Sequence, residues 1–280
     1  MRDPWILGVL CGVVLLLVVL APGVKTWPAV PKKALGPFDV YVINVDGETA
    51  RLRHFTKEFA TSDLSVGGQT FIRVPAIRGD TLAIENVVSR RALREILAAE
   101  RTGFRLRHYQ LSRNAVGCYL SHVRLWQSIL ETDKDVALIC EDDAQIHPKL
   151  RRFLEKTSVP ADFDLILLGY VCFKCSRDEA AGFHRVKRFF GLHGYLISRK
   201  GIKTLLQDNA HAMMPVRKQI DTVLSDLAEQ GRVTIYASTR KWVEQDNEDF
   251  RTSIQIPIQP GVRNPFGEIE EEDDDDDDES

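Results

Sequence analysis

The chain has 280 residues, of which 44% are hydrophobic and 28% are charged. This composition fits one large globular domain or two small ones, and it excludes mostly disordered, collagen-like and coiled-coil proteins. The net charge of −3 conceals a split: residues 268–280 hold 11 acidic and no basic residues, which leaves 37 basic against 29 acidic side chains before them, a net charge of +8. Five cysteines are too few for a disulfide-stabilised scaffold.

The first 24 residues are dominated by apolar side chains. Residues 5–24 are uncharged, and a helix of this length, at about 1.5 Å per residue, would cross a hydrocarbon core of roughly 30 Å. We therefore expect residues 1–24 to be a membrane anchor or a signal, with a cleaved signal peptide as the alternative. Residues 25–37, with three prolines, are expected to form a stem. Three lysines follow the span and one arginine precedes it, a distribution that favours a cytosolic domain.

Predicted strands and helices alternate from residue 38 to residue 237. Runs of β-branched, aromatic and apolar residues predict strands over 39–46, 71–77, 135–140, 164–168, 184–190 and 233–237. Apolar residues at helical spacing predict helices over 50–60, 85–101, 114–131, 148–156, 201–207 and 219–230. The tripeptide Arg78-Gly79-Asp80 is interpreted as an ordinary turn. This alternation predicts an α/β domain with a mostly parallel sheet and a ligand crevice at the carboxyl ends of its strands.

Three adjacent carboxylates, Glu141, Asp142 and Asp143, directly follow the apolar strand predicted over 135–140. A hard divalent cation would offset their mutual repulsion, because Mg²⁺ and Mn²⁺ prefer carboxylate oxygens and keep positions open for substrate phosphates. At the end of a parallel strand such a site suits a nucleotide diphosphate. The alternative is a solvated acidic loop, and the triplet alone does not decide between the two.

Six short motifs follow one another along the chain. They are residues 41–46 with Arg51, Gly117-Cys118 with Ser121-His122, residues 138–143, residues 191–201, residues 219–221, and Gln245 with Ser253-Ile254. In this order they resemble glycosyltransferase family 25, which includes the lipooligosaccharide galactosyltransferases of bacteria and the collagen hydroxylysine galactosyltransferases of animals. The chain departs from the family pattern at Gly47-Glu48, where an arginine pair is usual, in its short length, and in the loop at 170–182.

The resemblance implies a glycosyltransferase-A fold, an α/β class with a mostly parallel central sheet, over residues 38–262. It also implies a UDP-sugar donor (UDP-galactose or another), Mn²⁺ or Mg²⁺, and inversion at the anomeric carbon. The metal would offset charge on the leaving UDP, and a carboxylate general base would take the proton of the attacking hydroxyl. The location implied is a single-pass membrane protein of the endoplasmic reticulum or Golgi with a lumenal catalytic domain, in conflict with the lysine distribution.

The metal ligands are expected among four residues. Asp143 is the expected direct ligand, and Asp142 and Glu141 are expected to contact the metal, the ribose or the residues behind them. His193 is a candidate late ligand, and its alternative is a structural histidine in a glycine-rich turn.

The resemblance assigns the remaining roles. Asp221 is the first choice of general base because it matches the family's later aspartate, with Asp226 as its rival; the alternative is that Asp221 merely favours the start of its helix. His122 is expected to contact the donor, unless it is a hydrogen-bonded core histidine. The candidates for contact with the uridine end of the donor are Asn44, Asp46 and Arg51. For Asn44 and Asp46 the alternative is that they cap the end of a strand.

The acceptor is left open between an anionic glycan, which the basic body suggests, and a hydroxylysine-bearing protein, which the animal relatives suggest; nucleic acid is not expected. Two other functions are considered: a membrane-tethered sugar-nucleotide or glycan-binding protein without turnover, and a Mg²⁺-dependent phosphohydrolase, for which no matching nucleophilic Asp and Lys are identified. Residues 263–280 are expected to be a disordered acidic tail that occupies the basic body, binds divalent ions or aids solubility. For Cys172 and Cys175, a loop disulfide or two free thiols is preferred to a redox dithiol.

Overall fold

The computed structural model describes residues 31–107, 110–175, 182–246, 250, 256–257 and 259–260. The expected anchor or signal at 1–24, the tail at 263–280 and the Ser253-Ile254 motif lie outside the described residues. Among the residues that are described, no helix has the length and apolar character that a bilayer-spanning segment requires.

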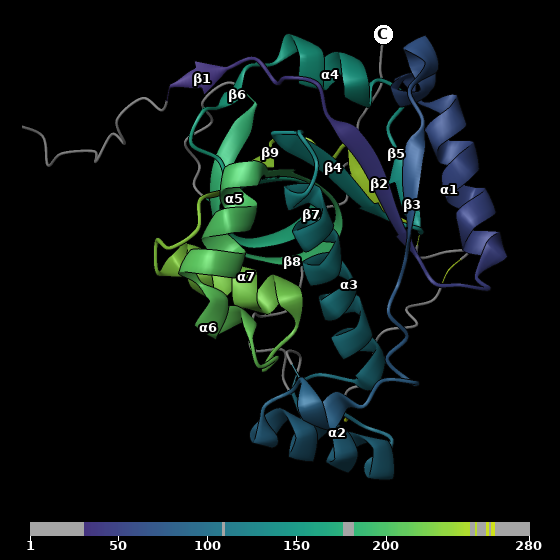
Figure 1. Ribbon diagram of the computed structural model, residues 1–280, viewed down its shortest axis with the longest axis vertical. Helices are drawn as coiled ribbons and strands as arrows, with labels where there is room; N and C mark the ends of the chain where they lie inside the picture. The colour runs from purple at the N-terminus through teal and green to yellow at the C-terminus, as the bar shows by residue number, and fades with distance from the viewer. Residues whose placement is uncertain are drawn as a thin grey trace, which may run out of the picture. The chain divides into compact units, whose positions relative to one another are not determined.

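A six-stranded sheet forms the centre of the domain, in the order β3-β2-β4-β8-β7-β9 (Figure 1). Its strands are β2 (Asp39–Asn44), β3 (Phe71–Pro75), β4 (Val136–Glu141), β7 (Leu165–Cys175), β8 (Phe183–Ser198) and β9 (Ile235–Ser238). β2 runs parallel to β3 and β4, and β7 runs parallel to β9, whereas β8 is antiparallel to β4, β7 and β9. The expected α/β class with a mostly parallel sheet is therefore confirmed.

Helices cover both faces of this sheet. Val40 and Val42 of β2 belong to one hydrophobic core, and Tyr41 and Ile43 belong to the other, because successive side chains of a strand point to opposite faces. Residues of α1 and α4 complete the first core, and residues of α2, α3 and α7 complete the second. The helices are α1 (Thr49–Thr61), α2 (Arg90–Thr102), α3 (Arg113–Leu130), α4 (Leu150–Lys156), α5 (Arg199–Lys203), α6 (Ala210–Met213) and α7 (Ile220–Glu229). A π-helical turn at Thr204–Asp208 follows α5, and short 3₁₀ segments lie at Asp63–Gly68 and Ile84–Asn86.

Two predicted segments differ in the structure. The segment at 170–182 was expected to be a loop, but its first part, as far as Cys175, belongs to β7. The segment at 191–201 was expected to contain a glycine-rich turn, but β8, a strand of 16 residues, continues through it to Ser198, and α5 begins at Arg199. The glycines serve close packing: a Cβ added to Gly194 would lie 2.6 Å from Cβ of Val243. His193 consequently projects from a strand.

Two short ladders lie beside the sheet. β5 (Ala144–Ile146) pairs with β10 (Val243–Gln245), which brings the chain after residue 242 next to the acidic triplet. β1 (Lys32–Lys33) pairs with β6 (Val159–Pro160), so the end of the segment expected to be a stem contacts the folded domain.

Candidate active site

The acidic triplet lies where β4 ends, beside the end of β2, as the parallel pairing of these strands requires. Asp142 is 6% exposed and Asp143 is 3% exposed. The amide of Asn44, the last residue of β2, donates to Asp142 Oδ2 at 2.7 Å, and Arg51 Nε on α1 donates to Asp142 Oδ1 at 2.7 Å. Each oxygen of Asp142 thus accepts a hydrogen bond from a residue that was predicted from the sequence to contact the donor.

Asp143 is satisfied at only one of its two carboxylate oxygens. Its Oδ2 accepts from Arg51 Nη2 at 2.5 Å and from the amide of Gln245 at 3.0 Å. Its Oδ1 is buried and has no hydrogen-bond partner among the described residues. Burial and the adjacent Glu141 raise the pKa of Asp143, while Gln245 and Arg51 oppose that shift.

Glu141 faces the helix α3. Its Oε1 lies 3.4 Å from Nε2 of His122 and 3.8 Å from Sγ of Cys118. Burial raises the pKa of Glu141, but the hydrogen bond and charge interaction with His122, together with the charges of His193 and Arg51, lower it, and the net shift is downward. Burial and Glu141 raise the pKa of Cys118 well above its usual range, which keeps that residue a thiol.

The ring of His122 is held from behind by a buried tyrosine. Nδ1 of His122 lies 2.8 Å from the hydroxyl of Tyr195, which accepts from the indole of Trp126 at 2.9 Å. If the tyrosine hydroxyl donates to Nδ1, the ring proton is on Nε2 and is directed at Glu141. Tyr195 therefore fixes the orientation of the histidine ring, so that Nε2 points toward Glu141.

The glycine and serine of the Gly117 to His122 motif fix the helix against the loop that follows β3. A Cβ on Gly117 would lie 2.4 Å from the carbonyl oxygen of Ile77, a distance that side chains do not tolerate. The amide of Ile77 donates to the Ser121 hydroxyl at 2.7 Å. Gly79 has the same constraint from the other side, because a Cβ there would lie 1.9 Å from the carbonyl oxygen of Arg113.

This contact closes one side of a cavity of about 200 Å³. Four of the predicted site residues line it: Arg51, His122, Glu141 and Asp142. Sequence reasoning missed several other lining residues, among them Glu48, Arg78, Gly79, Asp80, Asn114 and Cys118. The available signal was position, since the tripeptide at 78–80 follows a strand at the carboxyl edge of a mostly parallel sheet.

His193 and Asp221 lie outside this lining but within electrostatic range of Glu141. Asp221, in the first turn of α7, accepts from the amides of Gly191 at 3.2 Å and Thr222 at 2.6 Å. Burial raises the pKa of Asp221, against those hydrogen bonds. Burial lowers the pKa of His193, which is 7% exposed, against the opposing charge of Glu141.

Two further candidates are held in ion pairs. Asp226, the rival base, pairs with Lys218 at 2.6 Å and with Arg188 at 3.7 Å. Asp46 pairs with Arg73 at 2.6 Å, its side chain is 71% exposed, and it does not line the cavity.

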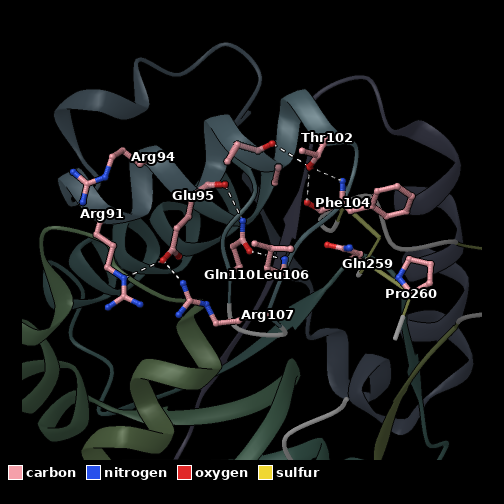
Figure 2. Close-up of a pocket in the computed structure, with 12 residues that line it drawn as sticks. Arg91, Arg94, Glu95, Thr102, Phe104, Leu106, Arg107, Gln110, Gln259 and Pro260 are labelled. Atoms are coloured by element: carbon pink, nitrogen blue, oxygen red, sulfur yellow. Dashed lines mark hydrogen bonds and ion pairs between the residues drawn. The ribbon is translucent and has the colours of Figure 1, made fainter. Parts of the chain in front are cut away.

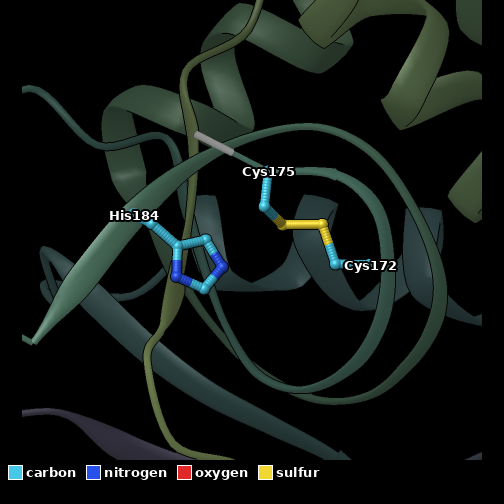
Figure 3. A group of neighbouring side chains, drawn as sticks. All are labelled: Cys172, Cys175 and His184. Carbon is cyan, nitrogen blue, oxygen red and sulfur yellow. A yellow bond between two sulfur atoms is a disulfide. The ribbon is translucent and has the colours of Figure 1, made fainter. Parts of the chain in front are cut away.

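Cys172 and Cys175 form a disulfide on β7, with His184 of β8 beside it (Figure 3). Since each sulfur is bonded to the other, neither is a thiolate available to a metal ion. Of the two preferred possibilities for these cysteines, the structure has the disulfide, but on a strand and not in a loop.

The sequence profile of glycosyltransferase family 25, described as an LPS biosynthesis protein, matches residues 38–220. The chain belongs to glycosyltransferase family 25. The matched range contains the acidic triplet and the Gly117 to His122 motif, and it ends one residue before Asp221.

Relatives in this family come from animals and bacteria. A glycosyltransferase 25 family member of Aedes aegypti is 24% identical over 71% of this chain and 33% of its own length. A putative glycosyltransferase of Haemophilus influenzae is 27% identical over 60% of this chain and 56% of its own, and human procollagen galactosyltransferase 2 is 24% identical over 69% and 31%. The chain thus spans about a third of the animal relatives and just over half of the bacterial one.

A solved galactosyltransferase, crystallised with donor and acceptor sugar analogues, resembles the chain with a TM-score of 0.39 and 17% identity, over 71% of this chain and 73% of that one.

Proposed function

We propose that this chain is a metal-dependent glycosyltransferase that moves a hexose, galactose being the first candidate, from a UDP-sugar to a glycan or hydroxylysine-bearing acceptor with inversion. The observation that supports it most directly is the buried Oδ1 of Asp143, which has no hydrogen-bond partner among the described residues. Asp143 itself does not line the cavity, but the preceding residues Glu141 and Asp142 do, together with other residues of the family motifs. Anchoring through residues 1–24 and a lumenal location stay predictions.

The residues present fit a hard divalent cation. An unpaired carboxylate oxygen is costly to bury, and a cation removes that cost. Asp143 would hold Mn²⁺ or Mg²⁺ through Oδ1. Both oxygens of Asp142 accept from Asn44 and Arg51, and Glu141 faces His122, so these two carboxylates would support the ion from neighbouring positions. Such an ion supplies Lewis-acid chemistry and offsets negative charge on a leaving diphosphate.

The chain's own side chains prepare the rest of the donor site. Arg51 fixes Asp142 and Asp143 in one arrangement, and Asn44 fixes Asp142 from the opposite side. Arg78 lines the same cavity, where both oxygens of Asp80 accept from its guanidinium, and it would have to exchange that pairing to contact the phosphates of the donor. His122, held by Tyr195, presents a ring nitrogen next to Glu141.

Asp221 is the proposed general base. Its raised pKa brings a carboxylate closer to the range in which proton abstraction is efficient near neutral pH. Two backbone amides hold it in place, so it is positioned before any acceptor arrives.

A binding protein without turnover is the second candidate, and one observation favours it. Glu48 lines the cavity where the family usually has an arginine pair, which places a negative charge near the proposed position of the donor phosphates. Such a protein would bind a UDP-sugar without releasing UDP.

The deciding experiment offers the full chain a panel of UDP-sugars with Mn²⁺ and measures both UDP release and transfer to candidate acceptors. We expect a chelator to abolish turnover and Asp143→Asn to lower kcat by at least about 100-fold, as removal of a major charge-stabilising group does. Asp133→Asn is the matched control, because the Asp133 side chain is 92% exposed. Turnover that survives both the chelator and Asp143→Asn would refute metal dependence, and binding without turnover for every donor would favour the second candidate.

The base assignment has its own test. Asp221→Asn keeps one of the two oxygens that accept from the Gly191 and Thr222 amides, turns an NH2 group toward the other amide and removes the proton acceptor. We expect kcat to fall by about 10²- to 10⁴-fold while the affinity for the donor changes little. A parallel series with Asp226→Asn separates the two candidates. An unchanged kcat in the Asp221 variant would show that the residue is not the general base and only stabilises the start of its helix.

A further inference from the structure

A second pocket, of about 800 Å³, lies away from the acidic triplet, around α2 (Figure 2). One helix face, the loop at 104–107 with Gln110, and residues 259–260 line it. In Figure 2, Arg91 and Arg94 lie at one end and Phe104 and Pro260 at the other. None of its lining residues is shared with the cavity beside Glu141.

Positive charge predominates in this α2 pocket. Among the described residues, three arginines, Arg91, Arg94 and Arg107, line it together with a single acidic residue, Glu95. Glu95 accepts from Arg91 at 2.9 Å and also pairs with Arg107. Arg94 is exposed, and no hydrogen bond or ion pair of its side chain occurs within the described residues. Counted over its described lining residues, the pocket therefore has a net positive charge.

Gln259 and Pro260 form part of the wall of this pocket. The amide of Arg105 donates to the carbonyl of Pro257 at 2.8 Å, and the amide of Gln259 donates back to the carbonyl of Arg105 at 2.9 Å. The Arg105 side chain, in a residue that is 3% exposed, donates to the carbonyl of Ile256 at 2.6 Å. These bonds fix the chain at the pocket eight residues before the acidic run begins at Glu268.

We propose that residues 268–280 bind within their own chain to the arginines of the α2 pocket. Eight residues from Pro260 to Glu268 span at most about 28 Å, and the 13 residues of α2 extend over about 20 Å. The segment can therefore reach every arginine of the pocket. Its 11 carboxylates complement the excess positive charge, and a short tether gives it a local concentration of about a millimolar or more.

The test compares the full chain with a full-length variant in which the 11 acidic residues at 268–279 are replaced by Asn and Gln. A fluorescent peptide with the sequence of residues 268–280 is titrated into both. We expect the neutral-tail variant to bind the peptide at least tenfold more tightly than the parent chain, because its pocket is not occupied, and we expect higher salt to weaken that binding. Hydrogen exchange of the α2 amides and of residues 104–107 should be slower in the parent chain.

Matched substitutions locate the contact. In the neutral-tail background, Arg91→Ser with Arg94→Ser should weaken peptide binding at least tenfold, whereas Arg152→Ser with Lys156→Ser on α4 should leave it unchanged. Both pairs remove two exposed positive charges from one helix. Equal peptide binding by parent and neutral-tail chains, or an equal loss in the α4 control, would overturn the proposal. Tight binding of the peptide with identical hydrogen exchange in the parent and neutral-tail chains would also overturn the proposal. That result would indicate that the pocket binds an anion from outside the chain.

Discussion

Two regions of the molecule contain a charged residue that pairs with two residues of opposite charge. The carboxylates are in excess in one region and the arginines in the other. At the end of β4, Arg51 bridges Asp142 and Asp143, whose side chains are 8% and 4% exposed. In the α2 pocket, Glu95 bridges two arginines whose side chains are 67% and 39% exposed. The same bridging pattern therefore has different consequences. Where it is buried, loss of the arginine would leave carboxylates without a partner, and where it is exposed, the charged groups stay in contact with water.

Removal of the bridging charge at the buried region should have the largest effect on stability. Arg51→Met keeps the apolar stem but leaves Asp142 and Asp143 without their cation, so we expect the free energy of unfolding to fall by about 3–5 kcal/mol. Urea unfolding followed by circular dichroism measures it. Arg152→Met on α4, an exposed position, is the control and should change little. If the Arg51 variant lost less than about 1 kcal/mol, as exposed pairs do, the carboxylates would be solvated, and the contrast between the regions would fail.

The acidic region was largely predictable from the sequence, because its residues are neighbours in the chain or lie at the ends of predicted strands. The triplet is contiguous, and Asn44 ends a strand expected to run parallel to the one before Glu141, so their meeting was foreseeable. Gln245 and Tyr195 were not predictable as partners of Asp143 and His122, since those contacts depend on β10 pairing with β5 and on the full length of β8.

The α2 pocket could not be predicted from the sequence in this way. Its arginines occur on an ordinary amphipathic helix, and nothing local to α2 indicates that residues 256–260 return to it. The glycines of β8 were misread for a related reason. A glycine selected for close approach of another strand, such as Gly194, has the same sequence signal as one selected for a turn.

A steric test of the acidic region should have the next largest effect. Gly117→Ala would normally stabilise a helix interior, because alanine has the higher helix propensity. Here the added methyl meets the Ile77 carbonyl at 2.4 Å, so we expect a net loss of about 1–3 kcal/mol, as for overpacked cores, together with weaker UDP-sugar binding. Gly36→Ala is the matched control, since no atom lies within 4 Å of an added Cβ there. Thermal unfolding and donor titration are the measurements. A stabilised Gly117→Ala protein would show that α3 can move away from the 77–79 loop.

The smallest effect on stability should come from the bridging charge of the α2 pocket. Glu95→Gln removes the carboxylate between Arg91 and Arg107, but both arginines stay in contact with water, so we expect a loss within about 1 kcal/mol. The same substitution removes a negative charge from the pocket and should increase the affinity of the neutral-tail chain for the acidic peptide, with the largest gain at low salt. Urea unfolding beside Arg51→Met and peptide titration at two salt concentrations measure both effects. A loss as large as that of Arg51→Met would mean that burial does not distinguish the two regions, because an exposed bridge would then support the fold as strongly as a buried one.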